Sequence, residues 1–161
     1  MKELEILKIL MENAKAEPDK IGVMLGMDPE EVKQIIKKLE DDKVIVKYMT
    51  LIDWEKTSCD KVQALIDVRV LPERGVGFDR VAQRIAMFPE VRSVYLMSGG
   101  YDLSVRVEGK SLKEVANFVS EKLAPLEHVQ STTTHFILKM YKKDGVILGD
   151  KEEDKRQVMI P

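Results

Sequence analysis

Apolar residues recur at helical spacing along the first third of the chain. Residues 2–14 place leucines and isoleucines every three or four positions with charged residues between them, which predicts an amphipathic helix. A second, shorter helix is predicted over residues 18–25, because Gly26 breaks the pattern. A third helix has a clear start, with Asp28 as N-cap and Pro29 at the first helical position.

The third predicted helix separates its apolar and polar residues onto two faces. The apolar face consists of Val32, Ile35, Ile36 and Leu39. The opposite face consists of Lys33, Gln34, Lys37 and Lys38. Two short helices joined by a tight glycine-containing turn, with outward lysines on the second, are typical of a helix-turn-helix. We therefore expect the polar face to contact DNA, and a solvated face whose lysines pair with nearby acids is the alternative.

Residues 44–54 are rich in β-branched and aromatic side chains. This composition predicts an extended strand that serves as a wing and then as a connector. The following segment, residues 55–61, is polar and turn-like, and we place the domain boundary there. The first domain is thus expected to be a winged helix-turn-helix over residues 1–54.

From Val62 onward the pattern changes to alternating strands and new helices. The expected elements are a strand over 62–71, a helix over 78–88, strands over 91–98 and 101–108, a helix over 112–123 entered through Ser111 as N-cap, and a strand over 129–141. With short, right-handed connections this order predicts a ferredoxin-like βαββαβ sandwich over residues 62–143. The expected fold class is therefore α+β.

The uncovered face of the sheet and the C-terminal tail lead to two further predictions. The sheet face opposite the helices carries Leu65 and Leu71 besides polar groups, so it would stay partly uncovered in a monomer. We expect two copies of the chain to pair through this face. The tail, residues 144–161, contains GVILGD, which could form a brief strand, and we expect the tail to be poorly ordered.

Gly99 and Gly100 separate the two strands of the predicted central hairpin. A Gly-Gly pair supplies positions where φ can be positive, which favours a tight turn. Alternation would place Tyr101 on the buried face with Leu103. The turn also brings bare backbone N–H groups beside a phenol and the carboxylate of Asp102, which could hold a small zwitterion by its carboxylate and its amine. A plain hairpin turn is the alternative interpretation.

Composition and charge narrow the classes of function. The 161 residues carry a net charge of −2, and Cys59 is the single cysteine, so neither an internal disulfide nor a cysteine metal cluster is expected. His128 and His135 lack matched carboxylates, and we expect no metal site, no cofactor and no catalytic activity. No apolar run reaches the roughly 20 residues of a membrane helix, so we expect a cytoplasmic protein without a membrane partner.

Three stretches of the chain match the pattern of a known family. They are IIKKLEDDKVI (35–45), MSGGYDLSVRV (97–107) and the run of Thr132, Thr133 and Thr134 that leads into ILK. With the order of parts, they make nearly all of residues 1–143 resemble the Lrp/AsnC (feast/famine) family of transcription regulators. The resemblance implies a dimer of paired C-terminal sandwiches, often assembled into larger rings, with an amino acid or related metabolite bound between dimers. It also implies an effector site at Gly99, Gly100, Tyr101, Asp102, Thr132 and Thr134.

The first domain departs from the family's pattern in its charge. Family members usually carry arginines in and around the recognition helix, whereas no arginine precedes Arg69, and residues 1–54 hold nine lysines against twelve acids, a net charge of −3. Glu30 and Glu31 in the first turn of the third helix favour the helix dipole but are repelled by DNA.

Two functions therefore stay open. The first is an amino-acid- or small-metabolite-responsive transcription regulator that binds double-stranded operator DNA as a homodimer or a higher oligomer of dimers. The second is a metabolite-sensing or assembly module whose helix-turn-helix has lost DNA binding and serves oligomerisation or protein docking.

Overall fold

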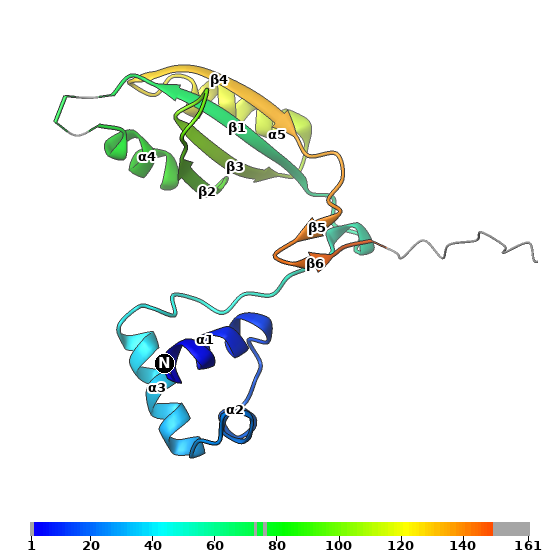
Figure 1. Ribbon diagram of the computed structural model, residues 1–161. Coiled ribbons are helices and arrows are strands. Elements are labelled where there is room, and N and C mark those ends of the chain that lie inside the picture. The colour runs from blue at the N-terminus through cyan, green and yellow to red at the C-terminus, as the bar shows by residue number, and fades with distance from the viewer. Residues whose placement is uncertain (1, 73, 76, 150–161) are drawn as a thin grey trace, which may run out of the picture. The chain divides into compact units, whose positions relative to one another are not determined.

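The chain folds as two compact units, each with its own hydrophobic core (Figure 1). The computed structural model describes residues 2–72, 74–75 and 77–149. The first unit is Met1–Ile52 and the second is Asp53–Pro161. No helix in the described part of the chain is long and apolar enough to cross a bilayer.

Three helices make the first unit, as predicted. They are α1 (Lys2–Glu12), α2 (Pro18–Leu25) and α3 (Pro29–Asp41). The Asp28 side chain caps α3 by accepting a hydrogen bond from the Glu30 N–H at 2.8 Å. Gly26 ends α2 in the left-handed conformation, with φ of 64°. A Cβ atom at Gly22 would lie only 2.7 Å from the Met27 carbonyl oxygen, so α2 and the turn to α3 approach more closely than any side chain at this position would allow.

A small apolar core holds these helices together. It consists of Ile6, Leu10, Ile21 and Val32, with Ile35 and Ile36 partly buried against it. Because α3 contributes Val32, Ile35 and Ile36 to this core and Leu39 is buried as well, its polar stripe is left on the surface.

The strand predicted over residues 44–54 is wrong. Residues 44–53 pair with no strand, and a short 3-10 helix, η1 (Trp54–Lys56), follows. A strand needs a hydrogen-bonding edge, and the described residues of the first unit contain only helices. Tyr48 instead anchors the segment by donating to Glu40 at 2.8 Å, and burial together with this hydrogen bond raises the pKa of Tyr48 to about 12.

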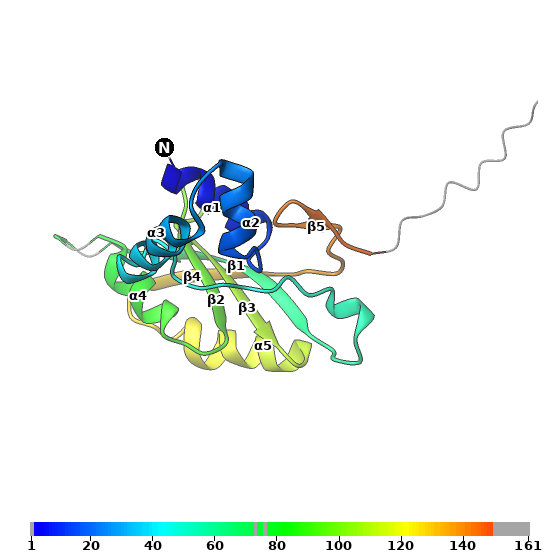
Figure 2. The same ribbon diagram turned by 90° about the horizontal axis from the view of Figure 1, so that it is seen from below.

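The second unit has the predicted ferredoxin-like βαββαβ order (Figures 1 and 2). Its strands are β1 (Val62–Val70), β2 (Val91–Leu96), β3 (Leu103–Gly109) and β4 (Val129–Phe136). They form an antiparallel sheet in the order β2-β3-β1-β4. Its helices are α4 (Asp79–Ala86) and α5 (Leu112–Phe118), and α5 continues as a π-helical turn, η2 (Val119–Leu123). Ser111 caps α5 as predicted, accepting from the Glu114 N–H at 3.1 Å.

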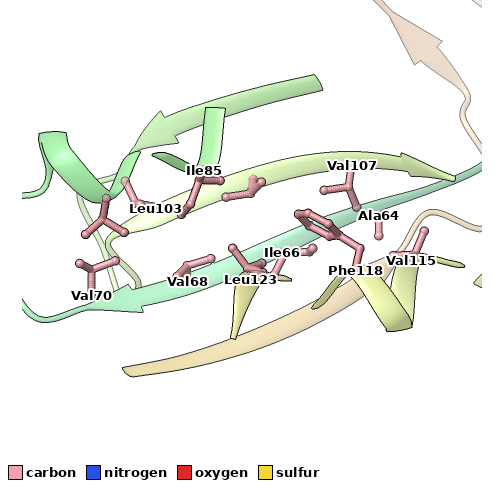
Figure 3. Packing of buried hydrophobic residues seen from close by; sticks show 12 residues of the cluster. Ala64, Ile66, Val68, Val70, Ile85, Leu103, Val107, Val115, Phe118 and Leu123 are labelled. Atoms are coloured by element: carbon pink, nitrogen blue, oxygen red, sulfur yellow. The ribbon is translucent and has the colours of Figure 1, made fainter. Parts of the chain in front are cut away.

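Both helices cover the same face of this sheet and enclose the larger core (Figure 3). Alternate residues of β1 and β3 point into it, including Ile66, Val68 and Leu103, each with no exposed surface. The helices contribute Ile85, Phe118 and others. No helix of the second unit covers the opposite face of the sheet in the described residues, and Leu65 on that face is 39% exposed.

The chain after β4 forms a small hairpin. β4 ends at Phe136, earlier than the predicted end at residue 141, and β5 (Lys142–Lys143) pairs with β6 (Val146–Ile147). Asp144 and Gly145 make the turn with φ of 48° and 81°, as a two-residue hairpin requires. The brief strand predicted in GVILGD is therefore present, whereas the rest of the tail, residues 150–161, lies outside the described residues.

The difference in burial between two leucines predicts different losses in the free energy of unfolding when each is replaced by alanine. Leu103→Ala should lower the free energy of unfolding of the second unit by about 2–5 kcal/mol, because Leu103 is fully buried. The matched control Leu112→Ala should change the free energy of unfolding by no more than about 0.5 kcal/mol, because Leu112 is 57% exposed. Trp54, the single tryptophan, lies in the second unit and reports its unfolding in urea by fluorescence. Equal losses in the two variants would contradict this assignment of the core.

Candidate functional site

The polar stripe of α3 is the first candidate site. Lys33, Gln34, Lys37 and Lys38 are all exposed, as the sequence predicted. Glu30 extends the stripe into the first turn of the helix, where its side chain is 71% exposed. The stripe thus mixes acceptors and donors along one accessible surface.

Two lysines of this stripe are paired with glutamates. Lys33 Nζ lies 2.5 Å from Glu30 Oε1, and Lys38 Nζ lies 3.1 Å from Glu3 Oε1. The hydrogen bond and charge of the glutamate raise the pKa of the lysine in each pair. The side chains of Gln34 and Lys37 make no hydrogen bond or ion pair with the described residues. The stripe therefore presents two lysines whose charge is balanced by a glutamate, Lys33 and Lys38, and two side chains without a partner among the described residues, Gln34 and Lys37.

The loop between β2 and β3 is the second candidate site. The last paired residues are Leu96 and Leu103, so the connection spans residues 97–102 and the prediction of a tight Gly-Gly turn is wrong. Neither Gly99 nor Gly100 has a positive φ. The loop is longer than a two-residue turn because its last residue, Asp102, is hydrogen-bonded to the backbone of the neighbouring strand β1.

Asp102 makes this attachment to β1. Its Oδ2 accepts a hydrogen bond from the Val70 N–H at 2.8 Å, and its own N–H donates to the Val68 carbonyl at 3.1 Å. The Asp102 carbonyl in turn accepts from the Met97 N–H at 2.8 Å, which closes the loop. One oxygen of the carboxylate is thereby committed to the backbone.

Tyr101 lies at the open face of the sheet, so its predicted place in the core is wrong. Tyr101 lies before the start of β3 at Leu103, so the alternating side-chain directions of that strand do not set the direction of its side chain. Its hydroxyl lies 3.0 Å from Thr133 Oγ1, and the Arg69 guanidinium lies 5.5 Å from the centre of its ring. Arg69 Nη2 also donates to the Gly100 carbonyl at 2.8 Å. The structure thus adds Arg69 and Thr133 to the residues around this loop.

Thr132 and Thr134 point to the other face of the sheet. They pair with Val68 and Ile66, whose side chains lie in the core, whereas Thr133 pairs with the outward-facing Asp67. The structure therefore does not bring Thr132 and Thr134 together with the loop. Because successive strand residues alternate in direction, only the middle threonine of the run reaches the open face.

The loop retains free backbone donors. The N–H groups of Gly99, Gly100 and Tyr101 donate no hydrogen bond to the described residues, and a Cβ built on either glycine would have open space around it. Exposed N–H groups beside a carboxylate can hold the two charged ends of an amino acid.

The open face itself carries a mixed set of side chains. Asp67 Oδ2 lies 3.1 Å from His135 Nε2, and Leu65 stands between Arg106 and His135 in the sheet register. Glu108 is approached by three cations at 2.9–3.8 Å: Lys61, Arg92 and Arg106. This face thus combines one partly exposed leucine with charged side chains on the neighbouring strands.

Comparisons with known proteins agree with this architecture. The family model for the Lrp/AsnC ligand binding domain matches residues 63–147, and a model for winged helix-turn-helix DNA-binding matches residues 2–46. The chain is 56% identical to the uncharacterized HTH-type transcriptional regulator YugG of Bacillus subtilis (strain 168), covering 99% of this chain and 97% of that protein. It is 30% identical to the HTH-type transcriptional regulator FL11 of Pyrococcus horikoshii, covering 86% and 89%.

Solved structures share the fold at lower identity. The transcriptional regulator NMB0573 of Neisseria meningitidis, in complex with L-Met, superposes with a TM-score of 0.72 at 23% identity, covering 92% of this chain and 94% of that one. AsnC of E. coli gives a TM-score of 0.66 at 19% identity, covering 89% and 96%. With two domains matched in order, the chain belongs to the Lrp/AsnC family of DNA-binding transcription regulators.

Proposed function

We propose that this protein is a cytoplasmic regulator that binds double-stranded operator DNA as a homodimer through α3 and responds to an amino acid at the loop of residues 97–102. The exposed polar stripe of α3, opposite an apolar face committed to the core, is the observation that carries the DNA-binding half. The effector acts by binding one assembly state more tightly than another, since only a difference in affinity can shift that equilibrium.

The stripe divides into two parts by its position along α3. In a helix-turn-helix the N-terminal residues of the second helix face base edges, so Lys33 and Gln34 are proposed to reach the bases. Lys37 and Lys38, one turn further on, are proposed to contact phosphates. Since the first 54 residues carry a net charge of −3, attraction to DNA has to come from this local surface.

The proposed phosphate contact of Lys37 predicts a change in salt dependence. Lys37→Gln should make the negative slope of log affinity against log salt shallower by about one. It should also weaken binding to all sequences alike. Titration of the protein's own upstream DNA at several salt concentrations measures this slope. Lys113→Gln, which removes the same charge from α5, should leave it unchanged. Equal slopes for Lys37→Gln and the wild type would contradict the contact, and no saturable DNA binding would favour a sensing or assembly module.

The effector site is proposed from the free donors and charges of the loop. The free N–H groups of Gly99 and Gly100 would donate hydrogen bonds to the effector carboxylate, and the second oxygen of Asp102 would accept one from its ammonium. Tyr101 would line the site. The L-Met complex of the Neisseria meningitidis protein supports an amino acid as the class of ligand. From their register, Thr132 and Thr134 are proposed to act through the packing of β4 rather than by direct contact.

The charge of Asp102 predicts a specific loss of effector binding. A thermal-shift screen of the common amino acids should find one that raises the melting temperature, and calorimetry then gives its affinity. Asp102→Asn should weaken binding about tenfold or more, because the amide keeps the hydrogen bond from Val70 but loses the charge. The control Asp144→Asn, in the exposed turn between β5 and β6, should bind as the wild type does. Unchanged affinity in Asp102→Asn would exclude the proposed ammonium contact.

The open face of the sheet is proposed as the dimer interface. Its exposed leucine, Leu65, lies at the centre of a face whose opposite side is already covered by helices. A twofold pairing would bring the same patch of each copy together.

This interface predicts the mass of the protein in solution. Light scattering at micromolar concentration should give at least twice the 18.4 kDa of one chain. Leu65→Glu should shift the mass toward the monomer, since pairing would bury two facing carboxylates. Leu138→Glu, at a position 94% exposed, introduces the same charge and should leave the mass unchanged. A monomeric wild type would rule out the interface.

A further inference from the structure

The first turn of α3 holds a carboxylate and an ammonium side by side. Glu30 is the second residue of the helix, and Lys33 follows three positions later, so both side chains leave the same side of the helix. Their charged atoms lie 2.5 Å apart, with side chains 71% and 51% exposed. The pair is therefore both preformed and accessible.

Arginine is absent from this unit. The first arginine of the chain is Arg69, so bidentate recognition of guanine by arginine cannot come from the first 54 residues. Any base recognition by α3 has to use a carboxylate, an amide or a lysine. Glu30, Lys33 and Gln34 are the residues of those types nearest the start of the helix on its exposed side.

A C·G base pair is complementary to this ion pair. In the major groove guanine presents two acceptors, O6 and N7, and cytosine beside it presents the N4 amino donor. The lysine supplies donors and the glutamate supplies an acceptor at neighbouring positions. A thymine in place of the cytosine would instead set its O4 acceptor and methyl group against the carboxylate.

We propose that Glu30 and Lys33 together read one C·G base pair of the operator, with Glu30 accepting from cytosine N4 and Lys33 donating to guanine O6 and N7. Gln34, next along the stripe and free of partners among the described residues, reads an adjacent adenine through its N6 and N7. This inference rests on the proposed DNA binding by α3 and names the base chemistry that it recognises.

The same carboxylate also disfavours wrong sequences. Against phosphates alone Glu30 is repelled, and beside a thymine it loses water without gaining a hydrogen bond. Glu30 thus lowers affinity for DNA in general and keeps it only where a cytosine amino group is offered. Specificity then comes from a penalty on other sequences as much as from attraction to the correct one.

The test is a selection of DNA sequences by the full chain. Duplexes with a randomised central region are selected, and the preferred sequence and its single-base variants are then titrated at fixed salt. We expect one position of each half-site to require cytosine, with replacement by thymine weakening binding about tenfold or more. In Glu30→Gln that discrimination should fall below about threefold at this position alone, while affinity for unrelated DNA rises because a negative charge is removed.

Glu31→Gln provides the matched control. It removes the same charge from the same turn, but the Glu31 carboxylate is directed to Lys2, whose Nζ lies 2.9 Å away. This variant should raise affinity for all sequences and keep the cytosine preference. If both variants change all sequences equally, or if the preferred base is not cytosine, the inference is overturned while DNA binding stands. If the wild type shows no saturable DNA binding, the proposed function fails and the inference fails with it.

Discussion

Burial of one face of β1 against two helices is the interaction on which the second unit depends. Ile66 and Val68 are fully buried there, between α4 and the continuous segment of α5 and η2. Once these side chains point inward, Asp67 and Arg69 must point outward, because strand residues alternate. Arg69 then reaches the Gly100 carbonyl, and the backbone of β1 holds Asp102. The shape of the loop is thus a consequence of the core.

The first unit follows the same logic with helices. Its core engages the apolar stripe of α3, and Gly22 lets α2 approach the turn closely, so the polar stripe is presented on the surface. The charges on that stripe are largely balanced within it or by α1. A helix with such balanced charge has little general attraction for DNA, so the proposed recognition through α3 would depend on matching individual hydrogen-bond groups more than on net charge.

Much of the fold could be predicted from local patterns, whereas long-range contacts could not. Asp28 and Ser111 acted as caps because capping depends on residues only a few positions apart. The strand predicted over residues 44–54 failed because β-branched residues form a strand only where an edge is available. Tyr101 was misplaced because its partner, Thr133, is remote in sequence. Arg69 carried a usable signal, a polar residue at an outward register position of the first strand, but nothing local tied it to Gly100.

The strand order has a consequence for how the chain acquires its structure during synthesis. The central strand β1 pairs with β4, so the sheet is incomplete until residues 129–136 have been made. The first unit ends at Ile52, and its helices contact one another over short sequence distances, which favours rapid folding. The helical unit can therefore fold first as the chain leaves the ribosome, while the backbone N–H and C=O groups along one edge of β1 stay unpaired until β4 is made. For that interval the nascent second unit is the part of the protein most exposed to aggregation and to chaperones.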